Sequence, residues 1–273
     1  MRLLNGAELA DYIKERQLKQ SRNLIQEYKI IPRLAIIRTG QNTVTDTYLR
    51  LKTSYGEDIN VEVGVYESAD EDLMALIKKL NDDVNTHGII IQLPLENADQ
   101  TDAAVNAVAP EKDVDGLGLI ADFTPATAMA IDWLLVGYNV DLVGKKIAIV
   151  GNGRLVGAPL AKLWQGIGRD VSVYDDTTID LADKLKIADI IVSATGMPGL
   201  IKSNMIRQKA VVVDAGTASE NGKIVGDVAD EVRDRQDLTI TPIRGGVGPL
   251  TIAALFDNLI TAARKSIEKK VSK

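Results

Sequence analysis

The chain has 273 residues, a formal net charge of −6 and no cysteine. This length suffices for two modest domains or one large one. The absence of a long basic block argues against nucleic acid as a partner, and the absence of cysteine excludes disulfides, thiolate catalysis and cysteine-ligated metals. No apolar run approaches the ~20 residues of a membrane span, and the first residues carry no apolar signal region. We therefore expect a cytoplasmic protein with no membrane partner.

The first half of the chain alternates between helical periodicity and short apolar runs typical of buried strands. Helices are expected at residues 9–28, 44–55, 72–80 and 98–108. Strands are expected at residues 34–37, 60–66 and 88–92. This alternating order predicts an α/β domain with a parallel sheet.

The alternation of helices and strands is interrupted at residues 109–127, which contain two prolines and an acidic, glycine-containing loop. We interpret this stretch as a site loop and a connection to a second domain. Helices are then expected from 124 or 125 to 137, from 155 to 164, at 181–187 and at 250–265. Strands are expected at 147–150, 170–174, 190–193, 210–214 and 238–241. The second half is therefore a second α/β domain.

A glycine-rich turn links the strand at 147–150 to the helix after it, with glycines at Gly151, Gly153 and Gly157. Glycines permit a tight turn and a close approach to a pyrophosphate, which binds at the positive end of a helix. The spacing is one residue longer than the usual dinucleotide fingerprint. The sequence favours nucleotide binding here, and the alternative is a turn that only needs small residues.

Two acids, Asp175 and Asp176, follow the next expected strand. An acid roughly 20 residues after such a glycine loop can bond the ribose hydroxyls of a dinucleotide. The alternative is that both side chains point to solvent and begin a turn.

Tyr48 and Lys52 lie four residues apart on an expected helix and therefore share one face. A lysine that is desolvated in a cleft can transfer protons. Gln92 ends a strand at the carboxyl edge of the sheet, where α/β proteins bind ligands. The alternatives are a solvated lysine, a packed tyrosine ring and a glutamine that caps the backbone.

Asp113 and Asp115 alternate in the acidic loop, where either can bind a ligand or stabilise a turn. His87 is the only histidine. No histidine-based triad or zinc site is therefore available, and no metal is expected.

Together these pieces resemble a known family, the bifunctional methylenetetrahydrofolate dehydrogenase/cyclohydrolases. Six motifs occur in that family's order, at residues 48–52, 92–95, 112–116, 151–159, 226–228 and 245–249. The resemblance covers nearly the whole chain. It implies an N-terminal α/β catalytic domain that binds folate at 1–123 and is completed by the C-terminal helix 250–273. It also implies a Rossmann-like nucleotide-binding domain with a parallel sheet at 124–249.

The resemblance implies oxidation of 5,10-methylenetetrahydrofolate to the 5,10-methenyl form with NAD or NADP, followed by hydrolysis to 10-formyltetrahydrofolate. It implies that Lys52 assists proton transfers, that Gln92 orients the attacking water, and that Tyr48 stacks on the folate rings. An acid of the loop, Asp115 in our choice, accepts hydrogen bonds from the pterin. A homodimer formed through the nucleotide domains is implied as well.

The remaining expected site residues follow from the same resemblance. Those expected to contact substrate are Tyr48, Gln92, Asp113, Asp115, Gly246 and Pro249. Those expected to contact the cofactor are Gly151, Asn152, Gly153, Arg154, Leu155, Val156, Gly157, Asp175, Asp176, Thr195 and Gly196.

Two departures from the family pattern matter. Asn152 stands where the family usually has arginine, and acids end the second strand of the nucleotide domain. We therefore expect NAD to be used at least as well as NADP, unless Arg154 supplies the missing cation.

The loop after Gly116 is shorter than usual, which keeps two alternatives open: a monofunctional NAD-dependent dehydrogenase, and a catalytically silent folate- or nucleotide-binding protein.

Overall fold

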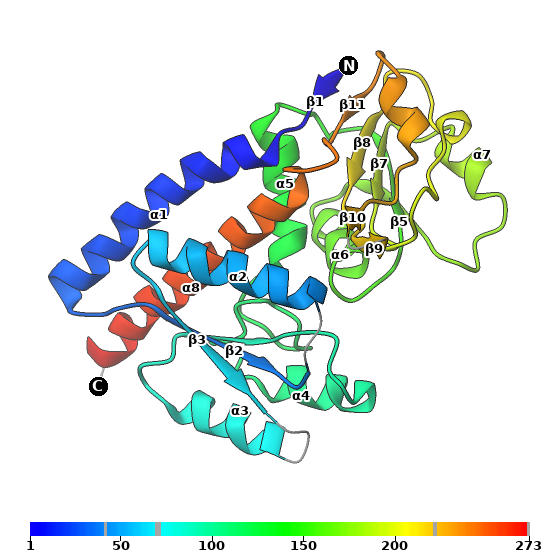
Figure 1. Ribbon diagram of the computed structural model, residues 1–273. Coiled ribbons are helices and arrows are strands. Elements are labelled where there is room, and N and C mark those ends of the chain that lie inside the picture. The colour runs from blue at the N-terminus through cyan, green and yellow to red at the C-terminus, as the bar shows by residue number, and fades with distance from the viewer. Residues whose placement is uncertain (41–42, 69–71, 221–222, 272–273) are drawn as a thin grey trace. The chain divides into compact units, whose positions relative to one another are not determined.

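The computed structural model describes residues 1–40, 43–68, 72–220 and 223–271, which form two α/β units (Figure 1). The first unit comprises Met1–Ala10 and Thr127–Thr251, and the second comprises Asp11–Ala126 and Ile252–Lys273. The chain passes from one unit to the other within three helices. These are α1 (Gly6–Tyr28), α5 (Ala126–Gly137) and α8 (Val247–Val271). The expected α/β class with parallel sheets is confirmed.

The first unit is built on a six-stranded parallel sheet with the order β1-β11-β8-β7-β5-β6. Its strands are β1 (Arg2–Leu3), β5 (Lys146–Val150), β6 (Asp170–Tyr174), β7 (Ile190–Ser193), β8 (Val211–Asp214) and β11 (Thr239–Ile240). From β5 the chain moves to β6 on one side and then returns to β7 on the other. The carboxyl ends of β5 and β7 therefore form a topological switch point, where open α/β sheets bind ligands.

Two features of this unit were not expected. Strand β1 pairs with β11, which places residues 1–10 in this unit rather than with residues 11–123. A two-residue strand is too short to show a periodicity. An antiparallel hairpin is formed by β9 (Ala218–Glu220) and β10 (Lys223–Val225).

Helices α6 (Gly157–Gly166) and α7 (Leu181–Leu185) accompany the sheet where the apolar periodicity predicts them. Two short 3₁₀ turns, at Ser203–Met205 and Asp230–Asp234, lie outside the helices predicted from sequence. Fully buried Trp164 of α6 donates its indole N–H to Asp132 of α5 over 2.9 Å. The core under the sheet is apolar and includes Val150, Ile191 and Val212.

The second unit is built on a three-stranded parallel sheet with the order β3-β2-β4. The strands are β2 (Arg33–Arg38), β3 (Glu62–Glu67) and β4 (Gly88–Ile91). The helices are α2 (Thr43–Asp58), α3 (Leu73–Asp82) and α4 (Thr101–Ala107), with a 3₁₀ turn at Ala98–Gln100.

Helices cover both faces of this sheet, as the buried apolar runs of β2 and β4 require (Figure 1). Ala35 and Ile37 face the core that α3 and α4 complete. On the other side, a methyl group at Gly56 of α2 would lie 2.5 Å from Val63 and 3.4 Å from Phe256 of α8. Helices α2 and α8 therefore pack closely on that face, and the glycine permits the approach.

Helix α8 is also tied to the loops of the second unit by a buried amide. Asn258 donates to the carbonyl oxygens of Val114 and Thr124 over 2.9 and 3.0 Å. This fixes the segment that leads from the acidic loop to α5. Among the described residues, no helix is long and apolar enough to cross a membrane.

Candidate active site

Lys52 and Gln92 meet at the carboxyl end of the sheet in the second unit. Lys52 lies in the middle of α2, and Gln92 follows β4 directly. The ammonium nitrogen of Lys52 donates to Gln92 Oε1 over 3.1 Å. Gln92 Nε2 donates to the carbonyl of Leu93 over 3.2 Å. This second bond orients the amide so that its oxygen faces the lysine.

Asp115 completes this group because the acidic loop runs alongside β4. Asp113 forms a parallel bridge with Ile89, and the Ile89 N–H donates to the carbonyl of Lys112 over 2.8 Å. The loop thus continues the sheet by a few residues and brings Asp115 close enough to interact with Lys52.

Burial dominates the electrostatics of the pair. Desolvation lowers the pKa of Lys52, and the Asp115 carboxylate opposes this effect. Desolvation likewise raises the pKa of Asp115, and Lys52 opposes that effect. A lysine with a lowered pKa is neutral for a larger fraction of the time and can accept a proton at neutral pH.

Tyr48 lies one turn before Lys52 on α2 and is partly buried. Its ring therefore belongs to the same helix face as the lysine. Four residues predicted from sequence therefore lie at one end of the sheet. They are Tyr48, Lys52, Gln92 and Asp115.

Asp113 has a different environment from Asp115. It is 4% exposed and accepts backbone N–H bonds from Gly116 and Gly118 over 3.0 and 2.8 Å. Burial raises its pKa, and these bonds oppose the rise. Its geometry is that of a turn-stabilising acid, the alternative considered for it from sequence.

Lys112 and His87 have structural partners. The Lys112 ammonium donates to three carbonyl groups at the end of α3, those of Leu80, Asn81 and Asp83. His87 accepts the backbone N–H of Arg33 through Nδ1 over 3.2 Å. In the described part of the chain, no group of three or more potential metal ligands is clustered.

Gly246 and Pro249, also expected to contact substrate, belong to the first unit. Gly246 precedes α8, and a methyl group on Gly6 would lie 1.9 Å from its carbonyl oxygen. The close packing of these two glycines explains why this loop needs them.

The glycine loop of the first unit follows β5 at the switch point. Gly151 has φ +101°, and a methyl group there would lie 2.5 Å from the carbonyl oxygen of Ala194. A methyl group on Gly157 would lie 1.8 Å from the carbonyl oxygen of Gly151. Both glycines are needed for the turn and for packing helix α6 against it. A methyl group on Gly153 would have no neighbour within 4 Å, so packing within the protein does not require a glycine there.

The residues between these glycines form the exposed entrance to α6. Asn152, Gly153, Arg154 and Leu155 are exposed, and Val156 precedes α6 without a side-chain cap. In the first turn of α6 the Ala158 N–H already donates to the carbonyl of Gly153 over 3.1 Å, and Pro159 has no N–H. An anion at this position is therefore favoured by the helix dipole and by the exposed loop. This arrangement fits the pyrophosphate of a dinucleotide.

The acids after β6 are exposed. Asp175 Oδ1 accepts the backbone N–H and the hydroxyl of Thr177 over 3.1 and 2.6 Å, and these bonds lower its pKa. Asp175 therefore begins a turn, as the alternative from sequence supposed. Asp176 is exposed beside it.

Thr195 and Gly196 follow β7 at the same switch point. The Thr195 N–H donates to Asp227 over 2.7 Å, and Gly196 has φ +69°. Asp227 was not among the residues predicted from sequence. The glycine-flanked motif at 226–228 was noticed, but a buried acid without a local pattern gives no signal of its role.

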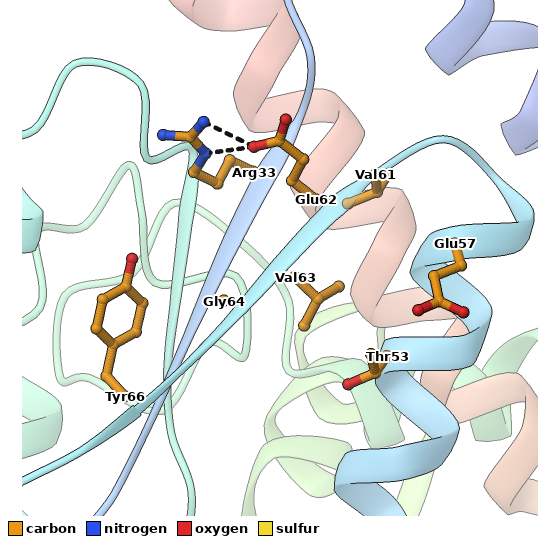
Figure 2. A pocket seen from close by; sticks show the side chains of 8 residues that line it. All are labelled: Arg33, Thr53, Glu57, Val61, Glu62, Val63, Gly64 and Tyr66. Atoms are coloured by element: carbon orange, nitrogen blue, oxygen red, sulfur yellow. Dashed lines mark hydrogen bonds and ion pairs between the residues drawn. The ribbon is translucent and has the colours of Figure 1, made fainter.

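A surface hollow of the second unit lies away from these residues. Figure 2 shows it between α2 and strand β3, with Thr53 and Glu57 on one side and Tyr66 on the other. Its volume is about 490 Å³, and the Arg33–Glu62 ion pair closes one end at 2.6 Å. None of the sequence-predicted site residues lines it.

Two family models match adjoining parts of the chain. The catalytic domain of tetrahydrofolate dehydrogenase/cyclohydrolase matches residues 4–115. The NAD(P)-binding domain of the same family matches residues 125–267.

Named relatives agree with this result over the full length. The bifunctional protein FolD of Aquifex aeolicus (strain VF5) is 38% identical over 285 residues, covering 99% of this chain and 98% of the relative. The crystal structure of the FolD dehydrogenase/cyclohydrolase of Campylobacter jejuni is similar with a TM-score of 0.91, at 36% identity, covering 97% of this chain and 99% of that one.

A third similar structure is the Trypanosoma brucei dehydrogenase-cyclohydrolase complexed with NADP cofactor and inhibitor. Its TM-score is 0.91 at 31% identity, covering 97% of this chain and 98% of that one. The alternatives of a monofunctional or silent protein are not favoured by these matches. The chain therefore belongs to the tetrahydrofolate dehydrogenase/cyclohydrolase family, as an enzyme with both the catalytic and the NAD(P)-binding domain of that family.

Proposed function

We propose that the chain oxidises 5,10-methylenetetrahydrofolate to the 5,10-methenyl form with NAD(P) and then hydrolyses this product to 10-formyltetrahydrofolate. The observation that carries the proposal is the 3.1 Å contact between Lys52 and Gln92, with Asp115 beside it. It places a lysine of lowered pKa among polar groups, inside the catalytic domain of a dehydrogenase/cyclohydrolase family.

Lys52 acts as the proton-transfer group in hydrolysis. Water attacks the methenyl carbon, and the neutral amine accepts the proton that the water loses. The hydroxyl group formed on this carbon then loses its proton as its oxygen becomes the formyl carbonyl. The bond between the carbon and ring nitrogen N5 breaks, N5 takes up one proton, and the formyl group stays on N10. One proton is released overall, because the substrate is a cation and the product is not. Burial lowers the pKa of Lys52, which favours the neutral amine that this step requires.

Gln92 positions the water. Its Oε1 accepts from Lys52, and its amide is held by the carbonyl of Leu93. A water molecule bonded to the lysine nitrogen therefore lies beside the glutamine as well. Fixing this geometry before the reaction removes part of the entropy cost of the step.

Tyr48 and Asp115 bind the folate. The Tyr48 ring, one turn before Lys52, stacks on the ring system of the substrate. Asp115 accepts hydrogen bonds from the amino-pyrimidine edge of the pterin, while Asp113 holds the loop in shape. Gly246, which precedes α8, and Pro249, in its first turn, contact the substrate in this proposal, as the family resemblance implies.

The cofactor binds at the switch point of the first unit, where bound NAD(P) supplies the acceptor for the hydride. Gly153 allows close approach, and the positive end of the α6 dipole favours the pyrophosphate. Thr195 and Gly196 approach from the end of β7. Hydride transfer itself needs no acid or base from the chain, so these residues act by positioning.

NAD serves at least as well as NADP in this proposal. Asn152 carries no charge for a 2′-phosphate, and Asp175 keeps one oxygen for a ribose hydroxyl while repelling a phosphate dianion. Because Asp175 is exposed, solvent and salt weaken this repulsion without reversing its sign. Arg154 is the nearby exposed cation that opposes this effect.

The family resemblance also supports a homodimer formed through the nucleotide-binding units. Light scattering at micromolar concentration tests it. A mass of two chains is expected, and a mass of one chain rules it out.

The function itself is tested with purified protein, 5,10-methylenetetrahydrofolate and either cofactor. We expect methenyl absorbance to rise first and then to decay as 10-formyl product forms. If neither cofactor yields the methenyl product, the dehydrogenase assignment is wrong. If the methenyl product accumulates and decays only at its uncatalysed rate, the hydrolase assignment is wrong.

A further inference from the structure

Asp227 is a buried acid that no step above uses. Its side chain is completely inaccessible, and Oδ2 accepts two bonds of 2.7 Å, from the Ser193 hydroxyl and from the Thr195 N–H. Its Oδ1 is also buried and has no hydrogen-bond partner among the described residues. A buried carboxylate oxygen without a partner is costly. The two bonds that Asp227 makes must therefore matter to the protein.

The surrounding backbone is shaped to hold this carboxylate. A methyl group on Gly216 would lie 2.0 Å from Asp227 Oδ1, so the acid rests directly against the glycine. Asp214 fixes the other side, because its carboxylate accepts the N–H groups of Asp227 and Val228 over 2.9 and 3.2 Å. Arg233 donates to Asp214 over 3.1 Å and balances its charge.

The residues that Asp227 holds lie at the switch point. Ser193 ends β7, and Thr195 follows two residues later. A methyl group on Gly151 would lie 2.5 Å from the carbonyl oxygen of Ala194 and 3.2 Å from Thr195 Cγ2. The segment 193–196 therefore packs against the glycine turn, and a movement of this segment displaces the turn.

We propose that Asp227 is a positioning residue for the nicotinamide cofactor. It anchors the segment 193–196 against the Gly151 turn, and this segment and turn position the cofactor. The proposal rests on the proposed function, in which this segment and the glycine turn contact NAD(P). It predicts that losing the carboxylate damages hydride transfer and cofactor binding while leaving hydrolysis intact, because Lys52 and Gln92 lie in the other unit.

The test compares Asp227→Ala with Asp227→Asn in three measurements: dehydrogenase kcat/KM for the cofactor, cofactor affinity by calorimetry, and hydrolysis of supplied methenyl substrate. Asp227→Ala should lower dehydrogenase kcat/KM on the order of 10²-fold, as misplacement of a cofactor loop does. Its hydrolysis rate should stay within about twofold of the parent. Asp227→Asn should restore most of the dehydrogenase loss, since one amide oxygen can accept both bonds.

A second pair of variants keeps the test independent of the stability of Asp227→Ala. Gly216→Ala displaces the intact carboxylate and should reproduce the selective loss. Gly166→Ala is the matched control, because a methyl group there meets nothing within 4 Å, and it should behave as the parent.

The proposal is overturned if Asp227→Ala and Gly216→Ala leave dehydrogenase kcat/KM unchanged, or if they lower both activities in the same proportion. A fall in Tm accompanied by such an equal loss assigns Asp227 a structural role only. Failure of the proposed function is distinct, since the parent chain would then produce no methenyl product.

Discussion

The Lys52–Gln92 contact allows the charge state of the lysine to be changed by a single isosteric substitution. Gln92→Glu keeps the shape of the side chain and places a carboxylate where Oε1 now lies, 3.1 Å from the Lys52 nitrogen. The new charge stabilises the ammonium form, so the pKa of Lys52 rises. Fewer enzyme molecules then carry the neutral amine at pH 7, and hydrolysis slows.

The distance sets the size of this effect. At 3.1 Å and an effective dielectric of about 20, the attraction between the charges is about 5 kcal/mol. Both side chains are partly exposed, so solvent reduces this value. Even about 1.4 kcal/mol lowers the neutral fraction tenfold. We expect hydrolysis of methenyl substrate at pH 7 to fall on the order of 10- to 10³-fold.

The assay is the pH dependence of methenyl hydrolysis between pH 6 and 10, with Gln92→Ala and Gln26→Glu as controls. Gln92→Ala loses one hydrogen bond, worth about 1 kcal/mol, and should slow hydrolysis without moving the profile to higher pH. Gln26 is exposed on α1, so Gln26→Glu adds the same charge away from the lysine and should behave as the parent.

The decisive feature is the direction of the shift. In Gln92→Glu, the rate should recover as the pH rises, because deprotonation of Lys52 is only postponed. A profile that stays in place, or moves to lower pH, refutes the claim that hydrolysis needs neutral Lys52.

Three further predictions follow from the same contacts. Asp115→Asn removes the carboxylate that raises the pKa of Lys52, so the pH profile of hydrolysis should move to lower pH while KM for folate increases; an unchanged KM contradicts the folate role. The ratio of kcat/KM for NAD to that for NADP should be one or greater, and a tenfold or larger preference for NADP contradicts the role given to the acids after β6. Asn258→Ala leaves the carbonyl groups of Val114 and Thr124 unpaired and should lower the free energy of unfolding in urea by about 2–4 kcal/mol; a loss below about 0.5 kcal/mol contradicts it.

Most strands and helices could be predicted because their apolar patterns are long enough to read. The buried runs of β5, β7 and β8 and the glycine turn after β5 all lie within two residues of the expected positions. Strand β1 could not be predicted, because its two residues are exposed and its partner β11 lies more than 230 residues away.

The site was predictable as a set of residues but not as a geometry. The helical spacing of Tyr48 and Lys52 indicates a shared face, yet nothing in the sequence brings Gln92 to 3.1 Å from the lysine. Asp113 and Asp115 differ by two positions and look alike in sequence. Only the bridge between Asp113 and Ile89 separates the acid that holds the loop from the acid that interacts with Lys52.

The burial and the bonds of Asp227 could not be predicted from the sequence. Its partner Ser193 lies 34 residues earlier, and the open space for its carboxylate comes from Gly216. An acid next to glycine is usually read as a surface turn. Its burial depends on three loops that meet only after the sheet has formed.

The measurement that tests the central claim most directly is hydrolysis of methenyl substrate by Lys52→Met. The methionine keeps the apolar stem of the side chain and removes the amine, so the fold should persist. We predict a loss on the order of 10²–10⁴-fold in the hydrolysis rate, as expected for removal of a proton-transfer group, with cofactor binding unchanged. Hydrolysis at the parental rate by a folded Lys52→Met variant would contradict the account.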